Sequence, residues 1–170
     1  DTHYTVTYAS GRKNVGTYKV SVKMIGNYTG TKTLTFKINP IDISKCTVKL
    51  SYISYTYTGS VKTPVVTVTN QYGTKLTKDK HYTVTYASGR KLVGTYKVTV
   101  KMIGNYTGTK TLTFKINPPK TTVASLKAGT KSITVNLTKK TTQVTGYQIQ
   151  YSTSKNFTNA KTKTLTSNST

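Results

Sequence analysis

The chain has 170 residues and a formal net charge of +23, which comes from 26 lysines and arginines against three acidic residues. Its one cysteine excludes an internal disulfide framework, and it lacks the run of about 18 apolar residues that a membrane-spanning helix needs. Threonine, valine, tyrosine and lysine dominate, and the first three favour half-buried strands, so the composition predicts an all-β protein.

One stretch of the chain occurs twice at a spacing of 78 residues. Residues 3–40 read HYTVTYASGRKNVGTYKVSVKMIGNYTGTKTLTFKINP, and residues 81–118 repeat them at all but two of 38 positions. The two differences are Asn14 against Leu92 and Ser21 against Thr99. A fixed period of this length is typical of an array of small domains, so we expect the two copies to fold alike and to expose the same surface.

Alternating apolar and polar residues predict strands throughout both copies. In the first copy the apolar rows are Tyr4, Val6 and Tyr8, then Tyr18, Val20 and Val22, then Leu34, Phe36 and Ile38. The second copy has the corresponding strands at Tyr82–Tyr86, Thr95–Met102 and Thr111–Ile116, preceded by strands at Cys46–Leu50 and Pro64–Val68. Turn signals separate them at Tyr57–Ser60, Asn70–Gly73, Ser88–Arg90 and Gly104–Gly108. This spacing is typical of a β-sandwich with one apolar and one polar face per sheet, and no helix is predicted.

Proline marks the boundaries, since an Asn-Pro pair ends each copy, at Pro40 and at Pro118, and proline cannot continue a sheet ladder. We predict the C-terminal half of one domain in residues 1–40, a complete domain in residues 41–118 and the first part of a different domain in residues 119–170. The last part has strand candidates at Ser132–Leu137 and Gly146–Ser152. Residues 1–40 cannot bury their apolar rows alone, so we expect upstream sequence, another chain or a partner to cover them.

Two parts of the chain resemble known repeat families. The stretches YTYTGSVKTPVVTV, from Tyr55, and HYTVTYASGRKLVGTYKVTVKMIGNYTGTKTLTFKI, from His81, resemble the immunoglobulin-like repeats of secreted and wall-attached proteins of gut Firmicutes. The tail is similar to the start of a fibronectin type III module, with SLKAGTKSITVNL as its first two strands and TGYQIQYSTS as its third. The resemblance implies tandem immunoglobulin-like β-sandwich domains in an extracellular protein, either secreted or attached to the cell surface. Such domains serve as stalks, spacers and adhesin modules, and surface repeats of gut bacteria bind host proteins that include immunoglobulins.

Groups for catalysis are scarce. The chain has no glutamate, and its two histidines, His3 and His81, occupy the same position of the two copies. Cys46 and His81 offer one nucleophile and base combination, but Cys46 shares an apolar face with Val48 and Leu50, which predicts a buried cysteine. The sequence has no metal-ligand cluster and no phosphate-binding glycine loop before a helix. We therefore predict a protein that is not an enzyme and that has no cofactor or metal site.

The basic residues are the main functional signal. Arg12, Lys13, Arg90 and Lys91 are predicted at hairpin tips, and Lys97, Lys101 and Lys115 in a ladder on a polar face, with Lys19, Lys23 and Lys37 in the first copy. One interpretation is solubility, because surface lysines also block edge-to-edge aggregation. The other is contact with an anionic partner, such as a sulfated or sialylated host glycan, mucin or teichoic acid. Charge alone also attracts nucleic acid, yet the sequence holds no nucleic-acid-binding motif.

Tyrosine-rich turns are the second candidate surface. Tyr55 and Tyr57 lie in the predicted turn Ser54–Gly59, and Tyr106 lies in a later one. Loop tyrosines give a large contact area at low entropic cost, which suits a host protein ligand such as an immunoglobulin. The alternative is that Tyr106 and its counterpart Tyr28 fold back and cap the end of the sandwich.

These features predict a non-catalytic, extracellular binding repeat of a bacterial surface protein. It would hold an anionic glycan or a host protein through its basic and tyrosine-rich surfaces, without inserting into a membrane. The alternative function is that of a passive stalk or spacer.

Overall fold

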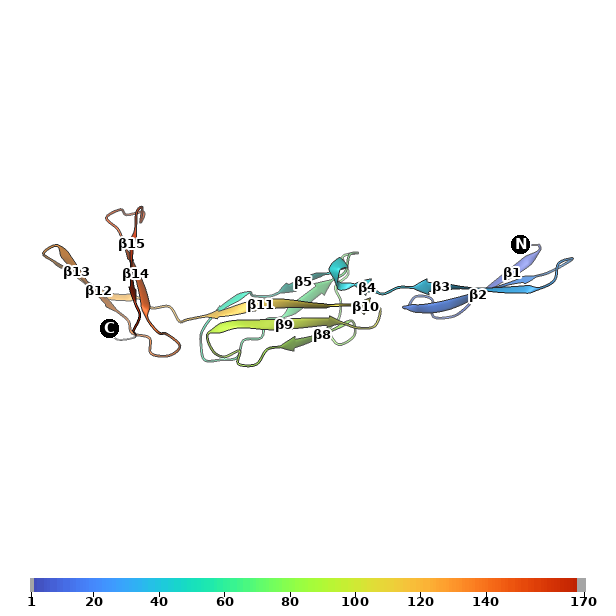
Figure 1. Cartoon of the computed structure of the whole chain (residues 1–170), viewed down its shortest axis with the longest axis horizontal. Coiled ribbons are helices and arrows are strands. Elements are labelled where there is room, and N and C mark those ends of the chain that lie inside the picture. Colours follow the sequence, from blue (N-terminus) through green and yellow to red (C-terminus); the bar gives the residue numbers. More distant parts are fainter. Residues whose placement is uncertain (1, 168–170) are drawn as a thin grey trace. The chain divides into compact units, whose positions relative to one another are not determined.

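The computed structural model describes residues 2–167 and is all-β, as the sequence predicts (Figure 1). The strands are β1 (Tyr4–Tyr8), β2 (Gly16–Met24), β3 (Thr31–Ile38), β4 (Ile41–Asp42), β5 (Thr47–Leu50), β6 (Ser54–Thr56), β7 (Val66–Thr69), β8 (Tyr82–Tyr86), β9 (Gly94–Met102), β10 (Tyr106–Thr107), β11 (Thr109–Asn117), β12 (Val123–Gly129), β13 (Ser132–Leu137), β14 (Tyr147–Tyr151) and β15 (Lys161–Leu165). A turn of 3₁₀ helix, Ile43–Lys45, lies between β4 and β5. No helix within residues 2–167 has the length and apolar character that a membrane crossing requires.

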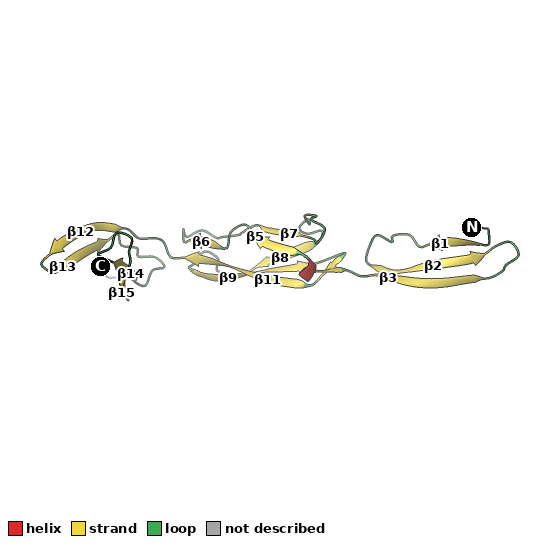
Figure 2. Cartoon of the chain, turned by 90° about the horizontal axis from the view of Figure 1, so that it is seen from above, coloured by secondary structure: helices red, strands yellow, loops and turns green. Residues whose placement is uncertain are grey.

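The strands form several separate sheets. In the first copy, β1, β2 and β3 make an antiparallel sheet with β2 in the middle. In the second copy, β8 pairs antiparallel with β9, and β6 adds in parallel to the free side of β11. The smaller pairs are β5 with β7, β4 with β10, β12 with β13 and β14 with β15. Figure 2 shows β5 and β7 in one layer and β9 and β11 in another.

The chain divides into two compact units. The first contains Asp1–Ser51, Val65–Tyr86 and Val98–Leu112, and the second contains Tyr52–Pro64, Ala87–Lys97 and Thr113–Thr170. Both units take strands from residues 41–118, so each is described in turn. The predicted domain boundaries after Pro40 and Pro118 stay predictions.

The core of the first unit forms where β5 and β7 meet β8 and the end of β9. Its buried side chains are Ile43, Cys46, Val48, Val66, Val68, Leu76, Tyr82, Val98, Val100 and Met102. Those that lie in strands are the inward members of the alternation, as the period of two requires, whereas Ile43, Cys46 and Leu76 lie outside the strands. Tyr82 joins the two layers, because its hydroxyl donates to the carbonyl oxygen of Val66 at 3.2 Å. The burial of Cys46 confirms the sequence prediction for this residue.

The core of the second unit contains Phe114 and Ile116, both on β11 and both buried. The ring of Tyr55 on β6 meets Phe114 edge-on, with ring centroids 5.7 Å apart. The ring of Tyr96 on β9 lies against the same phenylalanine at 5.6 Å. Aromatic pairs at these distances add stabilisation beyond the area that they bury.

The predicted turn at Ser54–Gly59 is wrong over Ser54–Thr56, which forms β6 and pairs with Lys115–Asn117. Within the predicted turn Gly104–Gly108, Tyr106–Thr107 likewise forms a short strand, β10, which pairs with β4. Both pairs are parallel, so their partners lie far away in sequence and leave no local hairpin signal. A strand of two or three residues is also too short for a period of two to be recognised.

The first copy forms the predicted strands but not a core. Tyr4, Val6, Tyr8, Leu34 and Phe36 are all exposed. This confirms the expectation that residues 1–40 cannot bury their apolar rows alone.

The C-terminal part consists of two hairpins within the second unit. β13 occupies the predicted range Ser132–Leu137, and β14 lies inside the predicted range Gly146–Ser152. β15 was not predicted, because its sequence KTKTL has only one apolar residue. Tyr147 on β14 is buried, and its hydroxyl accepts from the amide of Lys140 at 2.7 Å. An apolar groove lies between the hairpins, lined by residues that include Leu126, Ile133, Ile149 and Leu165.

Candidate ligand-binding surface

The hairpin tip of the second copy is tied to the segment that precedes it. Arg90 Nε donates to the carbonyl oxygen of Lys62 at 3.1 Å, and Lys62 N donates to the carbonyl oxygen of Arg90 at 3.0 Å. Arg90 Nη1 also donates to the carbonyl oxygen of Ala87 at 2.6 Å. The Arg90 guanidinium therefore holds the tip together, whereas the neighbouring Lys91 is exposed.

Lys62 is a basic residue of this tip that the sequence did not single out. Its Nζ donates to Thr58 Oγ1 at 2.6 Å and lies 5.9 Å from the ring centroid of Tyr55. Two predicted site residues, Tyr55 and Arg90, therefore share Lys62 as a neighbour. Lys62 and Arg90 are 28 residues apart, and no spacing rule connects them in the sequence.

The corresponding tip of the first copy is more open. Arg12 Nη1 donates to the carbonyl oxygen of Ala9 at 2.6 Å, as its counterpart does in the second copy. Its guanidinium carbon lies 4.8 Å from the ring centroid of Tyr8, a cation–π contact. Both Arg12 and Lys13 are exposed, so this tip presents two cations to solvent.

The polar face of the β1-β2-β3 sheet alternates lysine with hydroxyl residues. Lys19 lies opposite Thr35, Lys37 lies opposite Thr17, and Lys23 lies between Thr5 and Thr31. The expected lysine ladder is therefore wrong for this sheet, since Lys19 and Lys37 are diagonal neighbours and Lys23 has threonines on both sides. Like charges placed directly opposite each other destabilise a sheet, which explains the arrangement.

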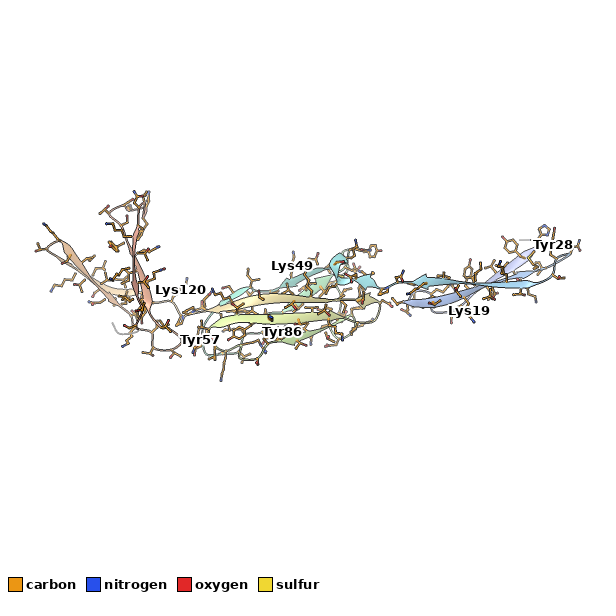
Figure 3. All side chains as sticks on the ribbon, viewed as in Figure 1. Lys19, Tyr28, Lys49, Tyr57, Tyr86 and Lys120 are labelled. Atoms are coloured by element: carbon orange, nitrogen blue, oxygen red, sulfur yellow. The ribbon has the colours of Figure 1, made fainter. Side chains whose placement is uncertain are left out.

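In the second copy, one predicted site lysine is also placed opposite a threonine. Lys97 and Lys101 are exposed on β9, and Lys101 lies opposite Thr83. Figure 3 shows the side chains along the strands, including Lys19 of the first copy and Lys49 on β5, which are both exposed. Threonine hydroxyls and lysine ammonium groups therefore share these surfaces.

The predicted site tyrosines are engaged in packing. The Tyr106 hydroxyl accepts from Asn70 Nδ2 at 3.2 Å, and its ring meets the His81 ring edge-on at 5.6 Å. This favours the interpretation that Tyr106 folds back onto its own domain. Tyr55 packs on Phe114 and is half-buried, as is Tyr57.

Cys46 and His81 have different hydrogen-bond partners. Burial raises the pKa of the Cys46 thiol, and the nearby Asp42 carboxylate raises it further. Cys46 Sγ donates to the carbonyl oxygen of Asp42 at 3.9 Å, whereas His81 Nδ1 accepts from the amide of Thr77 at 2.9 Å. A hydrogen bond from the backbone amide of Ser44 lowers the pKa of Asp42. Among residues 2–167 no group of three or more metal-ligating side chains is close enough to hold a metal ion.

The cations of this chain greatly outnumber the carboxylates. Lys78 Nζ lies 3.2 Å from Asp79 Oδ2, and both side chains are exposed. The three acidic side chains can neutralise only a small part of the 26 basic ones. The surface therefore carries a strong positive potential that attracts polyanions.

Compared with known proteins, the chain matches no family model, no curated protein and no solved structure. The functional conclusion therefore rests on the chemistry of the exposed residues.

Proposed function

We propose that this protein is a non-catalytic binding repeat of an extracellular bacterial surface protein, and that it holds an anionic glycan. The observation that carries the proposal is the polar face of the β1-β2-β3 sheet, where Lys19, Lys23 and Lys37 alternate with threonines. Lysine ammonium groups donate to sulfate or carboxylate oxygens, and threonine hydroxyls exchange hydrogen bonds with sugar hydroxyls. A repeating polyanion suits a surface on which both kinds of group recur.

The spacing of the cations supports a linear ligand. Lys19 and Lys23 are four residues apart on one strand, which is about 13 Å at about 3.3 Å per residue. Lys37 is a diagonal neighbour of Lys19 on the adjacent strand, at roughly 7 Å between Cβ atoms. Arg12 and Lys13 add two exposed cations at the hairpin tip that begins this face.

Nucleic acid fits this surface less well. Single-stranded nucleic acid is held by exposed aromatic rings on which bases stack. The positions that alternate with Lys19 and Lys23 on the polar face of β2 are Thr17 and Ser21, which have no ring. The polar face offers charge and hydroxyl groups without such rings.

A second candidate is a host protein ligand, such as an immunoglobulin. Tyr52 and Ile53 favour it, because they are 64% and 73% exposed and lie next to β6 in the chain. The ring of Tyr52 contacts that of Tyr55, with centroids 5.7 Å apart. Exposed aromatic and aliphatic side chains of this kind serve as interface anchors.

The test uses the whole chain on immobilised heparin, with a neutral dextran surface as the control. We expect binding that weakens steeply with added salt, because each neutralised anion of the polymer releases a condensed counterion. The variant Lys19→Gln/Lys23→Gln/Lys37→Gln should lose more affinity than a matched variant of three C-terminal lysines. That control is Lys120→Gln/Lys127→Gln/Lys155→Gln, at three exposed positions.

Equal losses in the two triple variants would show that net charge alone causes binding, and would reject the proposed face. Salt-insensitive capture of a host protein, abolished by Tyr52→Ser and Ile53→Ser, would favour the second candidate. Absence of binding to either class of ligand would leave the passive stalk as the function.

A further inference from the structure

The hairpin tip of the first copy contacts an asparagine of the second copy, and both lie in the first unit. Val15 N donates to Asn105 Oδ1 at 2.9 Å, and Asn105 Nδ2 donates to Asn14 Oδ1 at 3.1 Å. The Asn105 carboxamide therefore uses its acceptor and its donor on two adjacent residues of one tip.

This contact lies beside the linker that joins the two copies. Gly16, which follows the tip, pairs with Ile38 at the end of β3, and the linker 39–40 comes next in the chain. After the linker, Ile41 N donates to the carbonyl oxygen of Asn105 at 3.0 Å. Asn105 therefore holds the end of the linker through its backbone and the tip through its side chain. The first copy is attached at two points, and the second attachment restricts rotation about the bonds of the linker.

The tip keeps a fixed shape through bonds of its own. The Tyr18 hydroxyl lies 2.8 Å from the carbonyl oxygen of Gly11 and 2.9 Å from that of Asn14. Asn14 N donates to the carbonyl oxygen of Gly11 at 3.1 Å. A group that is already ordered loses little conformational entropy when it makes a further contact, so the bonds to Asn105 stabilise the attachment efficiently.

The second copy uses the same tip amide toward the segment that follows it. Within the second unit, Val93 N, the counterpart of Val15 N, donates to Gln143 Oε1 at 3.0 Å. In both cases a side-chain carboxamide oxygen from the following part of the chain accepts the bond. The two acceptors lie in unrelated sequences, which indicates that this tip amide is the common attachment point.

One of the two sequence differences between the copies falls at this contact. Asn14 accepts from Asn105, whereas its counterpart Leu92 has no side-chain acceptor. The other difference, Ser21 against Thr99, conserves a hydroxyl group. Asparagine therefore occurs at the tip that meets another copy, and leucine occurs at the tip that meets a different sequence.

We propose that Asn105 is a clasp, a residue that holds the hairpin tip of the preceding copy and restricts rotation of that copy about the linker 39–40. The clasp consists of two hydrogen bonds between uncharged groups, to Asn14 and to Val15. Its closure should therefore be insensitive to salt, in contrast with the contacts that the lysines make with an anion.

The experiment compares variants of the whole chain by NMR. In the parent, residual dipolar couplings from β1, β2 and β3 should fit the same alignment tensor as those from β5, β7 and β8. In Asn105→Ala the two sets should need different tensors. The hydrogen-exchange protection factor of the Val15 amide should also fall by about tenfold, because both bonds of the clasp are lost.

Asn27→Ala is the matched control, because Asn27 has the same position in the first copy as Asn105 in the second and is exposed. It should leave the Val15 protection factor and the shared tensor unchanged. The Ile41 amide shows whether the turn of Asn105→Ala keeps its shape, because its bond goes to the backbone of residue 105.

Asn14→Leu tests the clasp without changing the turn. It copies the residue of the second copy and removes one of the two bonds, so the Val15 protection factor should fall by a smaller factor, about threefold. Asn14→Asp keeps an acceptor at this position and should retain the protection. Different tensors in the parent, or an equal loss in Asn27→Ala and Asn105→Ala, would overturn the clasp. Protection of Val15 that is unchanged in both Asn105→Ala and Asn14→Leu would overturn it as well.

Discussion

Lys62 and Arg90 form a reciprocal pair, in which the amide of Lys62 donates to the carbonyl oxygen of Arg90 at 3.0 Å and Arg90 Nε donates to the carbonyl oxygen of Lys62 at 3.1 Å. Two cationic residues are thereby held next to each other through their backbone carbonyl groups. Backbone carbonyl oxygens act as the hydrogen-bond acceptors of the Arg90 guanidinium. In the first copy the counterpart Arg12 lies over the ring of Tyr8 instead.

Replacing Arg90 with lysine should destabilise the second copy while conserving its charge. The variant Arg90→Lys loses the bonds from Nε to Lys62 and from Nη1 to Ala87, at about 1 kcal/mol each. The matched variant Arg12→Lys loses one hydrogen bond and a cation–π contact at an exposed site, and should cost less. Denaturant unfolding followed by circular dichroism measures both, and equal costs would contradict the role given to the Lys62 contact.

An alanine substitution should destabilise the protein more at Gly108 than at its counterpart Gly30. Both have positive φ, at +97° and +108°, so alanine is strained at either position. Gly108→Ala adds a clash with Ile43 and should cost about 1–3 kcal/mol more than Gly30→Ala. Thermal unfolding of the two variants checks this, and the prediction fails if Gly30→Ala is as destabilising as Gly108→Ala.

The buried thiol of Cys46 should react slowly. Cys46 is 6% exposed, and burial favours the protonated thiol, which is the unreactive form. A bulky disulfide reagent should label the native protein far more slowly than the protein in denaturant. The control is Cys46→Ala combined with Thr47→Cys, which moves the thiol to an exposed neighbouring position. Rapid labelling of native Cys46 would contradict the described core.

The buried thiol of Cys46 should also make the folded protein less stable at alkaline pH. The pKa of Cys46 is higher in the folded protein than in the unfolded chain. The stabilisation that the buried, protonated thiol contributes is therefore complete below the ordinary pKa of about 8.5, and it is lost as the pH rises through the folded pKa. The free energy of unfolding should therefore decrease as the pH rises above the ordinary pKa of about 8.5. Cys46→Ala should flatten this decrease. A variant with the same pH profile as the parent would show that Cys46 does not cause the effect.

The two polar faces should act together on a polyanion. One triple variant changes Lys19, Lys23 and Lys37 to Gln, and the other changes Lys97, Lys101 and Lys115 to Gln. Each should reduce affinity for immobilised heparin by up to roughly 10²-fold, because the loss of either face removes the avidity of the linked sites. Combining all six changes should lower the affinity further. A loss of only about twofold in each separate triple variant would indicate independent, monovalent contacts.

The sequence predicted most strands of the two copies, because β8 and β9 alternate in every residue and the duplication shows the pattern twice. It also predicted the burial of Cys46 from the apolar row that this residue shares with Val48. Both inferences use neighbours within one strand. Local periodicity is enough for them.

The features of the fold that the sequence did not predict depend on pairs of residues that are distant in sequence. Tyr55 was placed in a turn because its three-residue strand is specified by pairing with Ile116 and by packing on Phe114. The lysine ladder was expected because the strand sequences alone do not give the register that sets Lys19 opposite Thr35. The contact of Lys62 with Arg90 also needs the folded backbone, since neither residue type requires the other.

The parallel pairing of β6 with β11 has a mechanical consequence. β6 precedes β11 in the chain, and the two strands run in the same direction. A pull on the chain before β4 and after β11 therefore draws the two strands past each other in opposite directions. The bonds from Lys115 N to Ile53 and from Tyr57 N to Asn117 are then loaded in shear at the same time and are not peeled apart one after another. Breaking such a pair requires several hydrogen bonds to fail together, so this part of the chain should resist extension.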